Sequence, residues 1–317
     1  MIGETSFPGA GRRILAIVVT YLPTRSLLRA LVETYAQQGA DVLVVDNTPA
    51  DDDCAWNCLE DLCASDSSIR LVRCGKNLGI AAALNVGIDV ALREGFDYAL
   101  LSDQDSEPEP DMLSGLREVH AALTARSTRV GCVAPAYFDR TTRQTFSFQV
   151  HAPGKLFYRN ASGEGALPWI EILTTITSGT LISRSALTEV GPMCEKLFID
   201  HVDTEWCHRA RQLGFKLYGT SSVRLDHRLG DNLLRIWLFG WRKCNEYSST
   251  RLYYRIRNFV LLCKLPYIST RWKFRSSLYW MLSVYGHLLF SASRRENLRM
   301  IVRGFRDGLR GRGGPLE

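Results

Sequence analysis

Two aspartates at the end of an apolar run are the residues best suited to bind a ligand. The run 98–101 leads directly into Asp103, Gln104 and Asp105. Side chains two positions apart on an extended segment point to the same side, so Asp103 and Asp105 face one ligand together. Two carboxylates on one side suit Mg²⁺ or Mn²⁺ holding a diphosphate. Such a pair is also typical of a polar turn whose side chains bond their own backbone.

A second acidic cluster precedes a predicted helix later in the chain. Asp200, Asp203 and Glu205 lie within six positions, beside His201. Acidic residues near a helix N-terminus complement the positive end of its dipole, which is a purely structural explanation for them. Three in so short a stretch, beside a histidine, are more than capping requires.

Alternating strands and helices are expected to position these residues. Near-continuous apolar runs at 13–21 and 41–47 predict strands buried on both faces, and 69–73 predicts a third. Apolar residues at helical spacing follow the first run at 26–38 and the third at 80–94. This alternation predicts an α/β fold with a mostly parallel, Rossmann-like sheet. In such sheets ligands collect at the carboxyl ends of the strands, where Asp103 and Asp105 would lie.

The second half of the chain has a different composition. The whole chain carries a formal charge of +6, but residues 231–317 hold 17 Lys and Arg against 5 Asp and Glu. We therefore expect residues 1–230 to form one domain, which contains the candidate ligand-binding and catalytic residues. A basic, aromatic-rich helical region at 231–317 is expected to complete the site and to contact a membrane. Residues 139–170 show no clean periodicity, which favours an insertion that shapes an acceptor pocket or moves as a loop.

Cysteine use and hydropathy indicate the compartment. Nine cysteines without paired metal-ligand spacing favour reduced thiols in a cytoplasmic protein, and no secretory signal is evident near the N-terminus. The longest apolar stretch, 277–292, is shorter than the roughly 20 residues of a spanning helix, so membrane contact is expected at the surface only. No recognisable nucleic-acid module accompanies the basic residues, and no nucleic-acid partner is expected.

Several short motifs, taken in order, resemble a known enzyme family. They are Val18-Val19-Thr20-Tyr21, Val45-Asp46-Asn47, Asn77-Leu78-Gly79-Ile80, Asp103-Gln104-Asp105, the string from Phe198 to Trp206, His227 and Arg257-Asn258. This set resembles the inverting, GT-A-fold family 2 glycosyltransferases, and within them the dTDP-L-rhamnose-dependent rhamnosyltransferases. The resemblance covers about residues 13–314. The string 198–206 and the ending 307–314 are most similar to the rhamnolipid-forming branch, which adds a second rhamnose.

The resemblance implies a role for each matching residue on the donor side. Residues expected to hold or border the nucleotide are Thr20, Tyr21, Asp46, Asn47, Asn77 and Gly79. Asp46 would accept a hydrogen bond from the thymine ring, and Asp103 would face the sugar or ribose. Asp105 would bind a Mg²⁺ or Mn²⁺ ion that bridges the phosphates, with His227 as a further metal or phosphate ligand.

The resemblance also implies a catalytic base and its neighbours. Asp203 matches the family's base, which takes the proton from the acceptor hydroxyl as that oxygen attacks C1. Glu205 is the nearest rival for the role of base. Asp200 and Gln104 are secondary candidates for site residues, without an assigned role. Arg257 would neutralise the departing diphosphate, or it would lie on a solvated face of a basic helix.

The predicted function is transfer of L-rhamnose from dTDP-L-rhamnose to a glycolipid at the cytoplasmic face of the membrane. The acceptor favoured by the resemblance is mono-rhamnolipid, and the alternative is an O-antigen or other polyprenyl-linked saccharide. A non-catalytic nucleotide-sugar-binding protein would lack a carboxylate of the set, and none is missing. A Rossmann-type epimerase is disfavoured because no G-x-G-x-x-G follows the first strand. The oligomeric state is not predicted.

Overall fold

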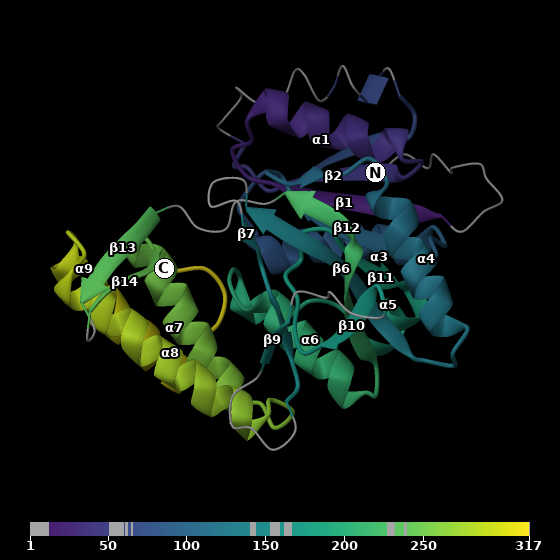
Figure 1. The fold of residues 1–317 in the computed structure, drawn as a ribbon. Coiled ribbons are helices and arrows are strands. Elements are labelled where there is room, and N and C mark those ends of the chain that lie inside the picture. The colour runs from purple at the N-terminus through teal and green to yellow at the C-terminus, as the bar shows by residue number, and fades with distance from the viewer. Residues whose placement is uncertain are drawn as a thin grey trace.

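One mixed sheet forms the centre of the fold (Figure 1). The computed structural model describes residues 13–50, 60, 63–64, 66–139, 144–152, 159–161, 167–226, 232–237 and 240–316. The strands of this sheet are β1 (Ile14–Thr20), β2 (Asp41–Asp46), β3 (Ile69–Arg73), β4 (Tyr98–Asp103), β5 (Glu107–Pro108), β6 (Val130–Asp139), β7 (Gln144–Thr145), β10 (Trp169–Ile172), β11 (Thr180–Ser183) and β12 (Lys216–Asp226). Their main order is β10-β12-β6-β11-β4-β1-β2-β3, with β5 paired to β12 and β7 to β6.

Along the main strand order, four of the seven pairings are parallel. Strand β1 pairs in parallel with β2 and β4, β2 with β3, and β6 with β12. Strand β11 is inserted between β4 and β6 and runs antiparallel to both. The predicted mostly parallel α/β sheet is confirmed. The reversed β11 has a local consequence, because it begins at the edge of the sheet where β4 ends.

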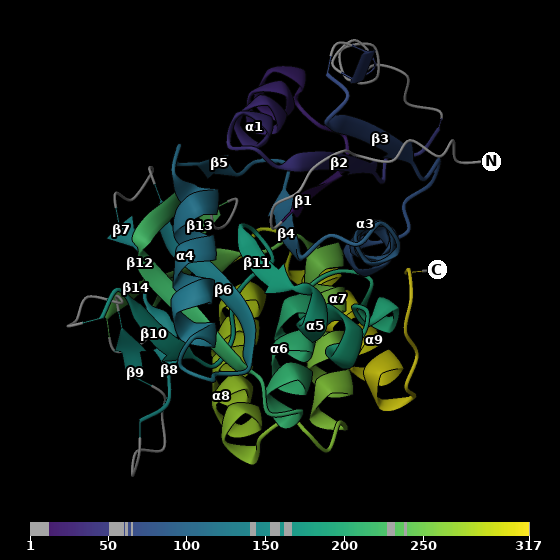
Figure 2. The ribbon, with the colours of Figure 1, turned by 90° about the vertical axis from the view of Figure 1, so that its right-hand side faces the viewer.

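Helices cover both faces of the sheet. They are α1 (Arg25–Gln37), α3 (Ile80–Arg93), α4 (Met112–Thr124), α5 (Arg184–Val190) and α6 (Val202–Gln212), with a short 3₁₀ turn η2 (Glu195–Leu197) before α6. Figure 2 shows α1 and α3 on opposite sides of β1 and β2. Helix α1 joins β1 to β2, and α3 joins β3 to β4 on the other side of β1 in the sheet. Because both crossovers are right-handed and run in opposite directions along the sheet, the two helices cover opposite faces. Every residue of β1 is buried, as a strand covered on both faces must be.

The C-terminal region packs beside the sheet domain. It contains β13 (Asn232–Trp237), β14 (Trp241–Glu246), α7 (Ser249–Cys263), α8 (Thr270–Leu289) and α9 (Arg294–Leu309). The sequence led us to expect helices alone here, and the β13–β14 hairpin is an addition. Its signal is alternation: Leu234 and Ile236 are buried, while Arg235 and Trp237 are exposed. Within the described residues, none of the helices combines the length and apolar character needed to cross a bilayer.

The unpatterned stretch 139–170 is partly strand. Besides β7 and the start of β10, its described residues form a small antiparallel hairpin of β8 (Phe148–Val150) and β9 (Arg159–Ala161). Phe148 and Val150 are buried in the main core. The cysteines of the described residues are free thiols.

Candidate active site

The end of β4 and the start of β11 meet at Asp103. Antiparallel pairing sets Thr180 opposite Leu101, which brings Ser178 beside Asp103, and the Ser178 hydroxyl donates to Asp103 Oδ2. Gly179 turns the chain here with φ 72°, and a Cβ at this position would lie 2.8 Å from Leu225 Cδ2. Ser178 was not among the predicted site residues. The Ser-Gly interruption of a β-rich run was the available signal.

The Asp103–Asp105 pair offers ligands for a divalent ion. Asp103 is half-buried and Asp105 is exposed at the same edge of the sheet. Among the described residues there is no cluster of three or more His, Cys, Asp or Glu side chains suited to a metal. Mg²⁺ commonly takes only one or two carboxylates and completes its shell with substrate phosphates and water, so two carboxylates fit an ion shared with a diphosphate. The other expected ligand, His227, lies outside the described residues.

The buried side chain of Asp46 links the ends of β1 and β2. Its Oδ1 accepts hydrogen bonds from the hydroxyls of Thr20 and Thr48, each at 2.8 Å, and its Oδ2 accepts from the Thr48 N–H at 3.0 Å. Thr20 and Asp46 are both fully buried. Burial raises the pKa of Asp46, and the bonds from Thr48 and Thr20 oppose that shift. Both side chains are hydrogen-bonded within the protein, and the expected role of Thr20 and Asp46 in holding the nucleotide stays a prediction.

Asn47 and Asn77 connect the loops that follow β2 and β3. Asn47 Nδ2 donates to Asn77 Oδ1 at 3.0 Å, and Asn47 Oδ1 accepts from the Leu78 N–H at 2.7 Å. Gly79 follows with φ 83°, and a Cβ there would lie 2.5 Å from the ring of Phe198. The absent side chain lets the N-terminus of α3 pack against the segment that precedes α6. Asn47, Asn77 and Gly79 were all expected to hold or border the nucleotide. In the structure they fix the loops after β2 and β3 to each other and to the segment before α6.

Gln104 ties the loop after β1 to the end of β4. Its Oε1 accepts from the Tyr21 N–H at 2.7 Å, and its Nε2 donates to the Tyr21 carbonyl at 3.1 Å. The Tyr21 side chain is 45% exposed. An exposed aromatic ring on a backbone fixed by two hydrogen bonds is suited to stack on a nucleotide base. Gln104, a secondary candidate in the sequence, becomes the residue that presents Tyr21.

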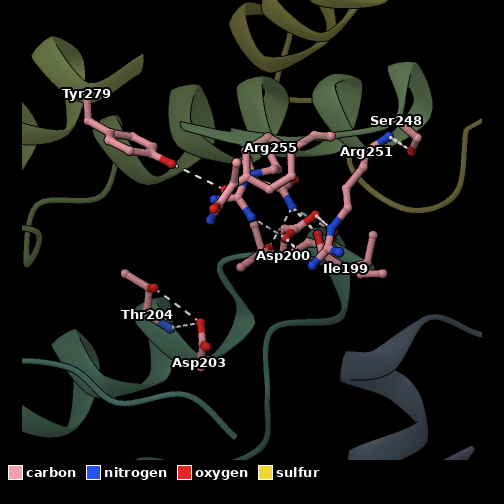
Figure 3. A network of polar contacts seen from close by, with 12 residues as sticks. Ile199, Asp200, Asp203, Thr204, Ser248, Arg251, Arg255 and Tyr279 are labelled. Atoms are coloured by element: carbon pink, nitrogen blue, oxygen red, sulfur yellow. Dashed lines mark hydrogen bonds and ion pairs between the residues drawn. The ribbon is translucent and has the colours of Figure 1, made fainter. Parts of the chain in front are cut away.

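Asp203 lies in the first turn of α6. It accepts hydrogen bonds from the Thr204 N–H at 2.5 Å and the Thr204 hydroxyl at 3.2 Å (Figure 3). Burial raises the pKa of Asp203 to about 6, the bonds from Thr204 oppose the shift, and the negative charges of Asp200 and Asp103 add to it. The negative charge of Asp103 is among the causes of this shift, so the carboxylate after β4 lies near enough to Asp203 to act on it electrostatically. A pKa near neutrality suits a general base.

A strained turn leads into Asp203. Phe198, Asp200 and His201 have φ of 62°, 63° and 64°, which is left-handed backbone that residues other than glycine rarely adopt. Asp200 accepts from Arg255 at 2.8 Å and from Arg251 at 3.3 Å, and Figure 3 shows it between these two side chains from α7. Asp200 is thus a partner of arginines that anchor the turn, and its carboxylate is engaged within the protein.

Helix α7 also holds the backbone of this turn. The side-chain amide of Asn258 donates to the carbonyls of Leu197 at 2.8 Å, Ile199 at 2.7 Å and Asp200 at 2.9 Å. Buried carbonyls satisfied in this way stabilise a conformation that the turn would not otherwise adopt. Asn258 was part of the resemblance but had no expected role. Its contacts span 58 positions of sequence or more, so local patterns could not reveal them.

Arg257 has a structural position, in contrast to its expected contact with the diphosphate. Its side chain is fully buried. The guanidinium donates to the carbonyl of Leu197 at 3.0 Å and to that of Gly314 at 2.5 Å. Gly314 in turn donates its N–H to the Lys196 carbonyl at 2.9 Å. Arg257 therefore joins the segment after α9 to the turn before α6.

Glu205, the rival base, points into the protein. It is 1% exposed and accepts from Arg209 Nε at 2.8 Å and from the Tyr267 hydroxyl at 2.6 Å. A carboxylate paired in this way is unsuited to reach an acceptor hydroxyl. Glu205 and Asp200 are thus both paired with arginines, and the role of Asp203 as the base stays a prediction.

Comparison with known proteins gives one family and one curated relative. The family model of glycosyl transferase family 2 matches residues 16–191. The chain is similar to the dTDP-rhamnosyl transferase RfbF of Shigella flexneri, with 28% identity over 298 residues that cover 94% of this chain and 96% of that protein.

Solved structures give the fold. GalNAc-T7, crystallised with UDP, GalNAc and Mn²⁺, has a TM-score of 0.59 at 13% identity over 94% of this chain. S. aureus TarS has a TM-score of 0.54 at 14% identity, again over 94% of this chain. The chain spans about half of these two structures, 56% and 49% of their lengths. The predicted GT-A-like arrangement, with helices after the sheet domain, is confirmed.

Proposed function

The chain belongs to glycosyl transferase family 2 and is a glycosyltransferase, and from this premise we propose that it transfers L-rhamnose from dTDP-L-rhamnose with inversion at C1. The donor is proposed because the similarity to a dTDP-rhamnosyl transferase extends over nearly the whole length of both chains. The observation that supports the reaction type is Asp203 in the first turn of α6, whose pKa is raised to about 6 by burial, with the charge of Asp103 adding to the shift.

Asp203 acts as the general base. At neutral pH it is mostly ionised, since its pKa is raised only to about 6. It takes the proton of the acceptor hydroxyl while that oxygen forms a bond to C1 of the sugar. The bond between C1 and the phosphate oxygen breaks, and its electron pair leaves with dTDP. The reaction needs no covalent intermediate, because attack and departure occur on opposite faces of the sugar.

The edge of the sheet binds the donor. Tyr21, held by Gln104, stacks on the base, and Asp103 faces the sugar or ribose. Asp105 would hold a Mg²⁺ or Mn²⁺ ion, as the carboxylates present at this edge allow. When bound, that ion supplies positive charge that stabilises the departing diphosphate. A structurally similar protein, GalNAc-T7, was crystallised with UDP and Mn²⁺, which supports a divalent ion here.

The proposed division of the chain follows from these roles. Residues 1–230 bind the donor and carry the base, and residues 231–317 complete the site by fixing the turn before Asp203. The contacts of Asn258 and Arg257 with residues 196–200 support this division.

The acceptor proposed first is a polyprenyl-linked saccharide of O-antigen or other polysaccharide assembly. The similarity to a dTDP-rhamnosyl transferase over nearly the whole chain supports this acceptor. Mono-rhamnolipid is supported only by the resemblance of short stretches such as 198–206. Mono-rhamnolipid remains a prediction that none of these observations tests. Both acceptors place the reaction at the cytoplasmic face of a membrane, where a nucleotide sugar and a lipid-linked acceptor meet.

A donor panel tests the proposal. The purified protein is incubated with Mg²⁺ or Mn²⁺ and with dTDP-L-rhamnose, UDP-glucose or GDP-mannose, and nucleotide release is measured with and without a polyprenyl-linked acceptor. We expect acceptor-dependent release of dTDP from dTDP-L-rhamnose, and a product heavier by one rhamnose. Turnover of another donor in preference to dTDP-L-rhamnose would refute the donor. If only mono-rhamnolipid gave a rhamnosylated product, mono-rhamnolipid would replace the polyprenyl-linked saccharide as the proposed acceptor.

A further inference from the structure

Helix α8 is apolar on two opposite faces. One face is buried and includes Trp272 and Trp280. The other carries five exposed apolar side chains, which we call the α8 outer face: Phe274 at 49% exposure, Leu278 at 36%, Met281 at 68%, Leu282 at 44% and Leu289 at 50%. With 3.6 residues per turn, these five positions fall within an arc of about 100°. A helix that only borders water carries polar residues on its outer side, so this face calls for a partner.

The α8 outer face is uncharged along its length and basic at both ends. Residues 276–293 contain no Lys, Arg, Asp or Glu. Arg271 and Lys273 precede this stretch, and Arg294 and Arg295 follow it. An apolar strip bounded by cations is suited to a surface that is apolar inside and anionic outside.

Two tryptophans of the hairpin extend the outer face. Trp237 and Trp241 are 51% and 62% exposed. The Tyr285 hydroxyl donates to the Trp237 carbonyl at 3.0 Å, and the ring of Trp241 lies 6.4 Å from that of Phe290. Figure 1 shows the hairpin beside α8, on the side of the molecule away from β1. Tryptophan is enriched where one part of a side chain meets hydrocarbon and the other meets water.

Helix α9 repeats this combination. Leu298, Val302, Phe305 and Leu309 are 50% to 57% exposed and recur at helical spacing, so they form one stripe. Arg295, Arg299, Arg306 and Arg310 run along the same helix and line one hollow with part of that stripe. A second copy of the chain would bring its own cations to this surface, whereas anionic headgroups complement them.

We propose that the α8 outer face, with Trp237 and Trp241, docks on a bilayer that contains anionic phospholipids. Helix α8 then lies in the plane of the interface, and the arginines of α9 contact headgroups. The 17 Lys and Arg against 5 Asp and Glu in residues 231–317 provide the required charge. The inference extends the membrane location of the proposed function and names the surface responsible.

Vesicle sedimentation tests the docking surface. The wild-type protein is spun with vesicles of phosphatidylcholine alone or of phosphatidylcholine mixed with phosphatidylglycerol. We expect binding to the mixed vesicles that weakens as salt is added, and little binding to the neutral ones. Replacing two exposed side chains in Met281→Gln/Leu282→Gln should reduce binding at least about ten-fold. The matched control Leu27→Gln/Leu213→Gln replaces two exposed leucines elsewhere and should bind like wild type.

Three results would each overturn the inference. The first is wild-type protein that stays in the supernatant with the mixed vesicles, and the second is a Met281→Gln/Leu282→Gln variant that sediments as wild type does. The third is a wild-type dimer in analytical ultracentrifugation that this variant converts to a monomer, since a second copy would then cover the face. The vesicle assay contains no donor and no acceptor, so a wrong donor or acceptor leaves its result unchanged. Thermal unfolding of each variant confirms that the fold is intact.

Discussion

The two sides of the active site are held in place by different parts of the molecule. On the donor side, the ends of neighbouring strands bond to one another, as Thr20 does to Asp46 and Gln104 to Tyr21. On the base side, Asp203 follows a strained turn whose conformation depends on α7, with Asn258 bonding Asp200 from 58 positions away. Sheet pairing thus organises the donor side, and long-range contacts organise the base side.

This contrast predicts how each side responds to substitution. Changes at the strand ends should alter donor binding, because the sheet keeps its geometry when one side chain is lost. Changes around the turn should alter the chemical step, because they move or remove the base while the donor still binds.

Removing the base should have the largest effect. Asp203→Asn keeps the shape of the side chain but cannot accept the proton, so we expect transfer to fall by about 10²- to 10⁴-fold. Binding of dTDP, measured by calorimetry, should stay near the wild-type value. Glu205→Gln is the informative comparison, because it should mainly lower thermal stability by disturbing the pair with Arg209. A transfer rate near wild type in Asp203→Asn would place the base elsewhere.

Removing a metal ligand should break the donor side instead. Asp105→Ala is expected to raise KM for the donor and to raise the Mg²⁺ or Mn²⁺ concentration needed for half-maximal activity, each by about ten-fold or more. Steady-state kinetics with metal titration measure both. Glu118→Ala removes another exposed carboxylate, on α4, and serves as the control. Unchanged donor and metal dependence in Asp105→Ala would contradict this assignment.

Loosening the turn tests the base side without touching the base. Asn258→Ala leaves buried carbonyls without their donor, which should cost about 1–3 kcal/mol of stability and lower kcat by about ten-fold or more, with donor KM nearly unchanged. Arg251→Ala removes a longer and more exposed contact to the same turn, at 3.3 Å, and should have a smaller effect. A rise in KM alone would mean that α7 acts on the donor side.

Removing the Tyr21 anchor should produce a smaller change on the donor side. Gln104→Ala deletes two hydrogen bonds to the Tyr21 backbone, so we expect donor KM to rise by a few-fold, about 1 kcal/mol, with kcat unchanged. Tyr21→Ala should raise KM in the same direction, and the double variant should add little to it. Fully additive effects would show that Gln104 and Tyr21 act independently.

The smallest expected effect is the pH dependence of stability. Because the pKa of Asp203 is raised to about 6 in the folded protein, its charged form is disfavoured by folding. Asp203 therefore stabilises the folded protein at low pH. This contribution to the free energy of unfolding is lost as pH rises from the ordinary carboxyl pKa of 3.8 through about 6. Asp203→Asn should therefore have a higher Tm than wild type at pH 8, and the difference should vanish near pH 4. The activity of wild type should decline as pH falls below about 6.

The sequence predicted the donor side better than the base side. Buried strands at 13–21, 41–47 and 98–101 place their polar ends together by a general rule of parallel sheets, and that rule located Asp103 and Asp105. It could not distinguish Asp46, which serves the protein interior, from a residue open to a ligand. Burial of a polar side chain depends on what packs over it, which one sequence does not state.

On the base side the residues were identifiable but their roles were not. Asp203 and Glu205 share a turn of helix, and only Arg209 and Tyr267 show which one is already engaged. Arg257 and Asn258 stand next to each other in a basic helix, and their partners lie 57 to 61 positions away. The reversal of β11 was also hidden, because a short apolar run does not reveal its direction.

The segment after α9 packs against the turn before α6. The Gly314 N–H donates to the Lys196 carbonyl, and a Cβ at Gly313 would lie 2.7 Å from that carbonyl. We expect that during refolding the nucleotide site forms once the strands pair, and that transfer activity returns only after this segment has docked. Recovery of dTDP binding should therefore precede recovery of transfer, and simultaneous recovery of the two would contradict this sequence of events.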